Sequence, residues 1–173
     1  MKVRTFEQLH NIREKFGPGI FGKIAQKLLA LAFYDAGYTH VVESSVQGVD
    51  IDAGNTRGKK YTVEVKTTAG DSISISQDNI DALKASVNNG YAPVIAALRV
   101  QMFEQWVFAG IPLDQIRPES IPLSRLRAYR IGDLEASVNP AFETVVNRHF
   151  NDVLARSEDP LIQILTRRRR QHA

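Results

Sequence analysis

The sequence contains no cysteine. Disulfide bonds and thiolate zinc sites are therefore excluded, which fits an intracellular protein. A long apolar run is also missing, because the longest candidate, residues 20–38, is interrupted by Lys23, Gln26, Lys27 and Asp35. The first residues lack the pattern of a signal peptide. These absences lead us to expect a cytoplasmic protein.

Histidine is scarce, and charge of one sign does not dominate. The four histidines lack metal-ligand spacing, and the net charge is only +3. The positive charge is nevertheless concentrated in three clusters: Arg57 with Lys59 and Lys60, then Arg125 with Arg127 and Arg130, and finally the arginine run at residues 167–170. Such clusters suit a polyanion such as nucleic acid. For the last cluster, a solvated tail or complementation of a helix dipole is an alternative.

The length of 173 residues and the apolar content of 43% suit one domain with a sizeable core. Residues 1–110 predict helix, three strands, helix and two strands, which is typical of an α/β sheet with packed helices. One helix is expected over residues 5–16, capped by Thr5, and a second over residues 20–35, after a break at 17–19. A further helix is expected after Ser76, which would cap it. The expected strands span residues 39–44, 46–52, 61–67, 92–100 and 105–109.

The last third of the sequence has a different character. Residues 110–122 contain three prolines and read as an extended connection. Residues 124–130 predict a short strand or turn, and a strong amphipathic helix is expected from Pro140. His149 lies within the apolar stripe of that helix, which favours a packed side chain over a metal ligand. A final helix is expected from Asp159, and its few apolar residues must pack on another element.

The sequence is organised around residues 46–67. The segments 46–52 and 61–67 each alternate apolar and polar side chains, which indicates two half-buried strands joined by a polar turn. Side chains two residues apart on a strand share a face. We therefore expect a core face with Val49, Ile51, Val63 and Val65, and an opposite face with Asp50, Asp52, Thr62, Glu64 and Lys66.

Three carboxylates and one amine would share that second face. Clustered carboxylates repel one another unless a positive charge offsets them. A hard divalent cation is the obvious candidate, because Asp50 and Glu64 from paired strands can supply its oxygen ligands. Lys66 would then orient a water or neutralise a phosphate. The alternative is an ordinary solvated strand face, on which alternating Thr, Glu and Lys are common.

These motifs resemble the PD-(D/E)XK nuclease superfamily, and within it the archaeal Holliday-junction resolvases and Mrr-type endonucleases. The resemblance covers residues 20–109, through the segments 35–38, 49–55 and 64–67 and the order of the elements that follow. It implies a restriction-endonuclease-like α/β fold, with a central mixed β-sheet flanked by helices and a C-terminal helical extension. Residues 1–110 would form the nuclease core, and residues 111–173 an extension packed on the core or on a partner subunit rather than an independent domain.

The resemblance also implies roles for individual residues. Asp50, Glu64 and the main-chain carbonyl of Val65 would hold Mg²⁺, with Mn²⁺ as a substitute, and Lys66 would be the catalytic lysine. Gln26 falls where many members place a helix glutamate that reaches the metal, and Val49 replaces the name-giving proline. Asp52 is a weaker candidate: it could contribute to a second metal, but we slightly prefer that it faces solvent. Thr67, Thr68 and Gln77 are weaker candidates for orienting water or phosphate.

The implied function is a metal-dependent DNA endonuclease of the Holliday-junction-resolvase type that acts as a homodimer in the cytoplasm, associated with the nucleoid. The basic residues Arg57, Lys59, Lys60, Arg125, Arg127 and Arg130 would contact DNA. One alternative is a restriction or homing-type endonuclease on the same fold. Two others are a non-catalytic DNA-binding protein with a decayed site, and a structural or assembly protein with a chance motif.

Overall fold

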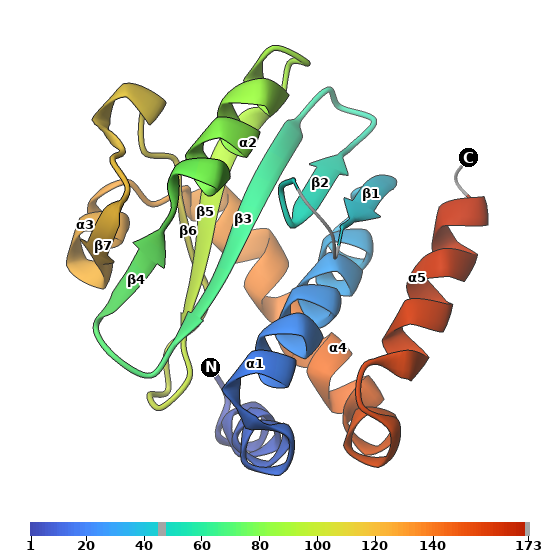
Figure 1. Cartoon of the computed structure of the whole chain (residues 1–173). Coiled ribbons are helices and arrows are strands. Elements are labelled where there is room, and N and C mark those ends of the chain that lie inside the picture. Colours follow the sequence, from blue (N-terminus) through green and yellow to red (C-terminus); the bar gives the residue numbers. More distant parts are fainter. Residues whose placement is uncertain (45–47, 172–173) are drawn as a thin grey trace.

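A computed structural model describes residues 1–44 and 48–171. Its centre is a five-stranded mixed sheet with the strand order β1-β2-β3-β5-β6 (Figure 1). The strands β3 and β5 are parallel, and the other neighbouring pairs are antiparallel. The bounds are β1 His40–Glu43, β2 Ile51–Gly54, β3 Lys60–Thr68, β5 Ala92–Arg99 and β6 Val107–Ala109. A separate antiparallel pair consists of β4 Ser72–Ile75 and β7 Glu119–Pro122.

Helices cover both faces of the central sheet (Figure 1). One face packs on α1 Val3–Asp35, α4 Gly132–Arg156 and α5 Asp159–Gln171. The other face packs on α2 Gln77–Val87, on α3 Leu123–Ala128 and on the β4–β7 pair, with the short 3-10 helix η1 Leu113–Gln115 nearby. The expected α/β fold, with a helix-flanked mixed sheet and a helical C-terminal region, is confirmed. Within the described part of the chain, no helix is both long and apolar enough to cross a membrane.

The first helix follows the sequence prediction except at its start. The expected break is a kink at Gly17, whose φ of 76° suits a residue without a side chain, and helix resumes through Pro18. Thr5 does not cap the helix, because α1 begins at Val3. Its side chain is instead buried, where its hydroxyl accepts a hydrogen bond of 3.2 Å from Asn147 of α4. Tertiary packing therefore overrides the local capping signal.

The central hairpin forms with a shorter first strand than expected. Strand β2 begins at Ile51, while Val46 and Gln47 of the expected strand lie outside the described residues. Ile51 and Val63 pair and face the α1 and α4 side, as expected. Val49 lies on the opposite side of the sheet, against the cluster beneath α2. Because α2 covers that face, the alternative of a solvated strand face is wrong for Glu64, which is only 2% exposed.

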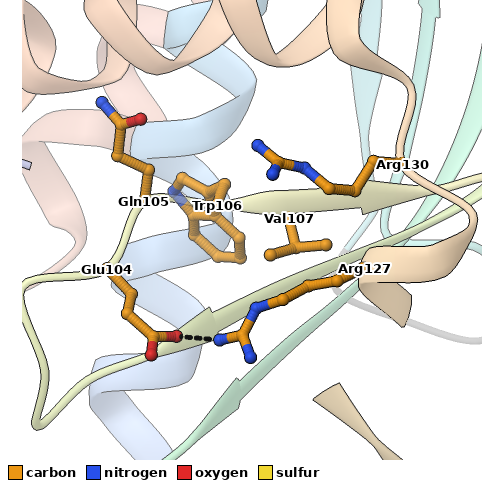
Figure 2. Close-up of a pocket in the computed structure, with 6 residues that line it drawn as sticks. All are labelled: Glu104, Gln105, Trp106, Val107, Arg127 and Arg130. Carbon is orange, nitrogen blue, oxygen red and sulfur yellow. Dashed lines mark hydrogen bonds and ion pairs between the residues drawn. The ribbon is translucent and has the colours of Figure 1, made fainter. Parts of the chain in front are cut away.

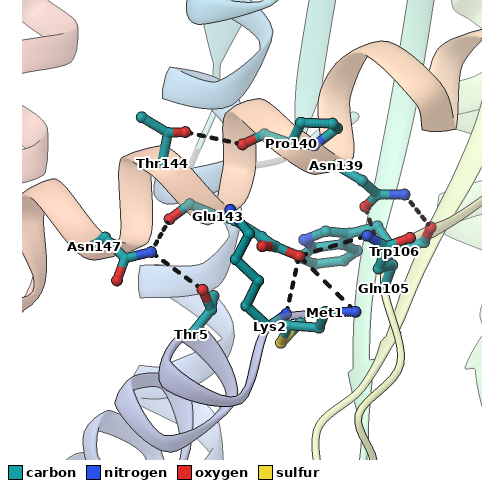
Figure 3. Close-up of polar contacts among 10 residues, drawn as sticks. All are labelled: Met1, Lys2, Thr5, Gln105, Trp106, Asn139, Pro140, Glu143, Thr144 and Asn147. Atoms are coloured by element: carbon teal, nitrogen blue, oxygen red, sulfur yellow. Dashed lines mark hydrogen bonds and ion pairs between the residues drawn. The ribbon is translucent and has the colours of Figure 1, made fainter.

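Two predictions for the C-terminal third are wrong. Residues 123–128 form helix α3 instead of a strand or turn, and α4 begins at Gly132, so Pro140 lies inside it. The early start has a clear reason, because two side chains of α4 bond to the main chain at the outer edge of β6, and Figure 3 shows one of them, Asn139, at Trp106. Asn139 accepts from the N–H of Trp106 and donates to its carbonyl, both at 3.1 Å, and Glu135 accepts from the N–H of Phe108. These bonds satisfy edge groups that a neighbouring strand would otherwise pair.

Candidate active site

The β2–β3 hairpin brings Asp50 beside the middle of β3. Its turn is ordered by Asn55, whose side-chain oxygen accepts from the N–H groups of Arg57 and Lys59 at 3.0 Å each. The resulting register leaves Asp50 just before β2. One oxygen of Asp50 accepts a short hydrogen bond of 2.7 Å from the N–H of Val65. The Asp50 carboxylate is thus anchored to the strand that contains Glu64.

Glu64 is a buried carboxylate that is only half satisfied. Its Oε1 atom forms an ion pair with Lys66 Nζ at 2.8 Å. Its Oε2 atom is buried and has no hydrogen-bond partner among the described residues. Leaving a buried charged acceptor unpaired costs free energy, so a buried orphan oxygen calls for an explanation.

The electrostatics of the two carboxylates agree with this picture. Burial raises the pKa of Asp50, and the nearby negative charge of Glu43 adds to the rise, while the Val65 N–H and Lys66 oppose it. Burial also raises the pKa of Glu64, and the charge of Asp50 adds to the rise, while Lys66 again opposes it. Burial and nearby negative charge therefore disfavour the ionised forms of both carboxylates, and Lys66 only partly offsets this effect.

Lys66 is held by a residue that the sequence analysis missed. Its ammonium donates to Asn79 Oδ1 at 3.2 Å. The same Asn79 oxygen accepts from the N–H and hydroxyl of Ser76, which caps α2 in return. The N-terminal turn of α2 thus fixes the orientation of Lys66. The spacing Ser76-x-x-Asn79 is a capping-box signal, and it is the sequence feature that points to Asn79.

Gln26 contacts the site through its amide. Its Nε2 group lies 2.9 Å from the carbonyl of Ser44, 3.0 Å from Glu43 Oε1 and 3.3 Å from the carbonyl of Asp50. The side chain therefore acts as a donor that ties α1 to the end of β1 and to the main chain of Asp50. Glu43 was also missed by the sequence analysis, because its single carboxylate at a strand end gave no distinctive signal.

The weaker candidates take different positions. One oxygen of Asp52 is buried without a hydrogen bond among the described residues, although solvent was the preferred expectation. Thr68 accepts from the N–H of Gly70 in the following turn, and Gln77 donates to Asp81 along α2. The Thr67 hydroxyl lies near Gly22, 3.7 Å from the position that a Cβ atom at residue 22 would occupy. Of these four, Asp52 alone has a buried oxygen without a hydrogen bond.

The basic residues occupy two separate regions. Arg57, Lys59 and Lys60 are exposed on the turn of the β2–β3 hairpin. The second arginine cluster lies beyond β6, so that β5 and β6 separate it from Glu64. Each of its members meets a carboxylate: Arg125 with Glu119, Arg127 with Glu104 and Arg130 with Glu135. Two of them line a cavity of about 310 Å³ beside Trp106 (Figure 2).

The donor set fits a hard divalent cation. Oxygen ligands from Asp50, from the unpaired Oε2 of Glu64 and from the Val65 carbonyl are the kind that Mg²⁺ and Mn²⁺ prefer. Within residues 1–44 and 48–171, no group of three or more His, Cys, Asp or Glu side chains gathers in metal-binding geometry. Two carboxylates with open positions suit a metal that keeps waters and takes substrate oxygens.

Comparison with solved structures identifies the fold. The chain is similar to Hjc, a Holliday junction resolvase from the archaeal hyperthermophile Archaeoglobus fulgidus, with a TM-score of 0.54 and 21% sequence identity. This is the fold of a Holliday junction resolvase. The match covers 67% of this chain and 96% of Hjc, so the resolvase fold accounts for two thirds of the residues. No family model and no curated protein sequence matches the chain. The resemblance expected from the sequence is thus confirmed at the level of the fold.

Proposed function

We propose that this protein is a metal-dependent DNA endonuclease that hydrolyses phosphodiester bonds in the cytoplasm, with a branched junction as its preferred substrate. The observation that supports this function best is the buried Glu64 with an unpaired oxygen, next to Asp50 and Lys66, in a fold shared with a junction resolvase. A buried glutamate beside a half-buried aspartate is costly in a protein that does not use them.

Asp50, Glu64 and the Val65 carbonyl are the residues that would hold the divalent cation, Mg²⁺ or Mn²⁺. Such a cation supplies Lewis-acid stabilisation of phosphate charge and an acidified water. Asp50 keeps its orientation through the Val65 N–H, and Gln26 ties its main chain to β1. Lys66, steadied by Asn79, neutralises charge on the scissile phosphate or orients the attacking water.

The proposed DNA contacts begin at the hairpin turn. Arg57 and Lys59 are exposed in the turn, and the exposed Lys60 begins β3, the strand that contains Glu64. Their charges would attract the phosphate backbone without reading sequence. The cluster Arg125, Arg127 and Arg130 stays in the proposal as a weaker contact, because each guanidinium already meets a carboxylate.

We also propose a homodimer, because resolving a four-way junction needs two strand cuts and each chain offers one site. Residues 1–110 would supply the nuclease core and residues 111–173 the extension. Light scattering should give twice the chain mass of 19.3 kDa. A mass equal to one chain, in the presence and absence of DNA, would contradict this part of the proposal.

The function is tested by a cleavage panel with four-way junction, flap, linear duplex and single-stranded DNA, each with Mg²⁺ and with EDTA. We expect Mg²⁺-dependent cleavage, strongest on the junction, and a loss of about 100-fold or more in Asp50→Asn and Glu64→Gln. Asp133→Asn, an exposed carboxylate on α4, is the matched control and should cleave like the wild type. Equal cleavage by all four proteins would refute the proposal.

A non-catalytic DNA-binding protein on the same fold is the second candidate. It is favoured by the Lys66 ammonium, which already neutralises one oxygen of Glu64, and by the lack of a third acidic ligand among the described residues. This candidate predicts DNA binding that is unchanged by divalent cations and by Asp50→Asn. Restriction or homing-type cleavage is a variant of the first proposal, and it predicts one preferred sequence in linear duplex.

A further inference from the structure

Helix α5 packs its apolar side on the rest of the molecule. Leu161 and Leu165 are buried in the cluster shared with α1 and α4. In Figure 1 the helix runs along the side of the molecule next to α1, with its C-terminal end near β1. Its polar side faces outward, and that side has no role in the function proposed above.

The last turns of α5 are fastened beside the candidate site. Arg168 pairs with Asp35 at 2.9 Å, and Arg169 donates to the carbonyl of Glu43 at 3.2 Å. Glu43 is the residue whose carboxylate accepts from Gln26, and its charge acts on Asp50. The C-terminal end of α5 is therefore held close to the residues that position Asp50.

A second contact joins the start of α5 to Glu43 as well. The buried ammonium of Lys27 bridges Glu43 at 3.2 Å and Glu158 at 3.0 Å, and Glu158 immediately precedes α5. An ion pair of this kind holds its geometry because the buried charges would be costly to separate. Both ends of α5 are thus anchored, and its outer surface has a fixed place relative to the site.

The outer surface of α5 is a stripe of residues, most of which have hydrogen-bond donors. Six residues of this stripe line a groove of about 450 Å³: Ile162, Gln163, Thr166, Arg167, Arg170 and Gln171. All but Ile162 have a side-chain donor, and residues 160–173 contain no Asp or Glu. Arg167 and Arg170 lie one turn apart, and no carboxylate of the described residues forms an ion pair with either. We call these six residues the α5 stripe.

We propose that the α5 stripe binds the phosphate backbone of DNA outside the cleavage site, as a second contact that strengthens substrate binding. This inference rests on the proposed function. Closely spaced guanidinium and amide donors without carboxylates suit phosphate oxygens. A second copy of the same stripe is a poor occupant, because two arginine rows would face each other across a two-fold axis.

The test compares Arg167→Gln/Arg170→Gln with the control Arg4→Gln/Arg156→Gln, which removes two exposed charges elsewhere. Binding of a labelled four-way junction is measured by fluorescence anisotropy in EDTA over a range of salt concentrations. We expect the α5 variant to lower the slope of log Kd against log salt by about 1 to 2 and to weaken binding several-fold. Single-turnover cleavage at saturating DNA should equal that of the wild type.

The outcomes separate the two proposals. A slope and a Kd equal to those of the control overturn the α5 contact, even if Asp50-dependent cleavage is found. A salt slope that is lower in the α5 variant, in a protein that cleaves no DNA, supports the α5 contact and refutes the nuclease proposal. Loss of binding to anionic lipid vesicles in the α5 variant, with DNA binding intact, also overturns the inference, because the stripe would then serve a membrane surface.

Discussion

At the scale of single residues, Gln26 is the most informative departure from the nuclease pattern. The superfamily resemblance of the sequence implies a helix glutamate at this position that would reach a bound metal. In this chain the amide instead donates toward Glu43 and toward the carbonyls of Ser44 and Asp50. All three neighbouring groups are acceptors, so a donor amide fits its surroundings where a carboxylate would not.

We predict that Gln26→Glu weakens the protein instead of improving the site. The new carboxylate would face Glu43 and two carbonyl oxygens, which should cost about 1 to 3 kcal/mol of stability and displace Asp50. Thermal unfolding and single-turnover cleavage measure the two effects. Gln101→Glu, an exposed position after β5, is the matched control and should change neither. Tighter Mn²⁺ binding with unchanged stability in Gln26→Glu would contradict this account.

At the scale of secondary-structure elements, the cap of α2 links folding to the site. Ser76 and Asn79 form a reciprocal capping box, and Asn79 also holds Lys66. The first turn of α2 therefore has two roles: it caps the helix, and it orients the amine of Lys66, the candidate catalytic lysine. Local stability and function can be separated here by two neighbouring substitutions.

We predict that Ser76→Ala and Asn79→Ala both destabilise the protein by about 0.5 to 2 kcal/mol through loss of the cap. Cleavage should fall clearly in Asn79→Ala alone, because Lys66 then keeps its ion pair with Glu64 but loses the Asn79 contact, which Ser76→Ala leaves in place. Denaturant unfolding and single-turnover rates measure the difference. Equal cleavage by the two variants would show that Asn79 does not position Lys66.

The elements predicted correctly from the sequence are those with local signals. Alternation identified the hairpin, and Ser76 and Gly17 marked a helix start and a kink. The errors arose where distant contacts decide the structure, as at Thr5, which α4 covers, and at the start of α4, which seals the edge of β6. Glu43 and the donor role of Gln26 were missed for the same reason, because they depend on side chains brought together from α1 and β1.

At the scale of the whole molecule, α1, α4 and α5 form one packed layer behind the sheet. Polar groups at its surface join the three helices, since Asp35 of α1 pairs with Arg148 of α4 and Arg168 of α5. His149 lies in this junction, half-buried, near these charges. We therefore expect the stability of the layer to depend on the protonation of His149.

We predict that the protein loses stability on mild acidification through His149. Burial lowers the pKa of His149 below its ordinary value of 6.5; Arg148 and Arg168 add to the effect, and Asp152 and Asp35 oppose it. The unfolded chain thus binds the proton more strongly, so this stability is present above about pH 6.5 and lost as the pH falls. In His149→Gln, the decline in melting temperature between about pH 7.5 and about pH 5.5 should be smaller. An identical decline in both proteins would contradict the assignment.

The central claim is that Asp50 and Glu64 together hold a divalent cation. Calorimetric titration of Mn²⁺ into the wild type, Asp50→Asn, Glu64→Gln and the Asp133→Asn control tests it directly, without DNA. We expect saturable binding to the wild type and the control, and loss of most of the binding heat in the two site variants. Saturable binding that is the same in all four proteins, or absent from the wild type, would contradict the claim.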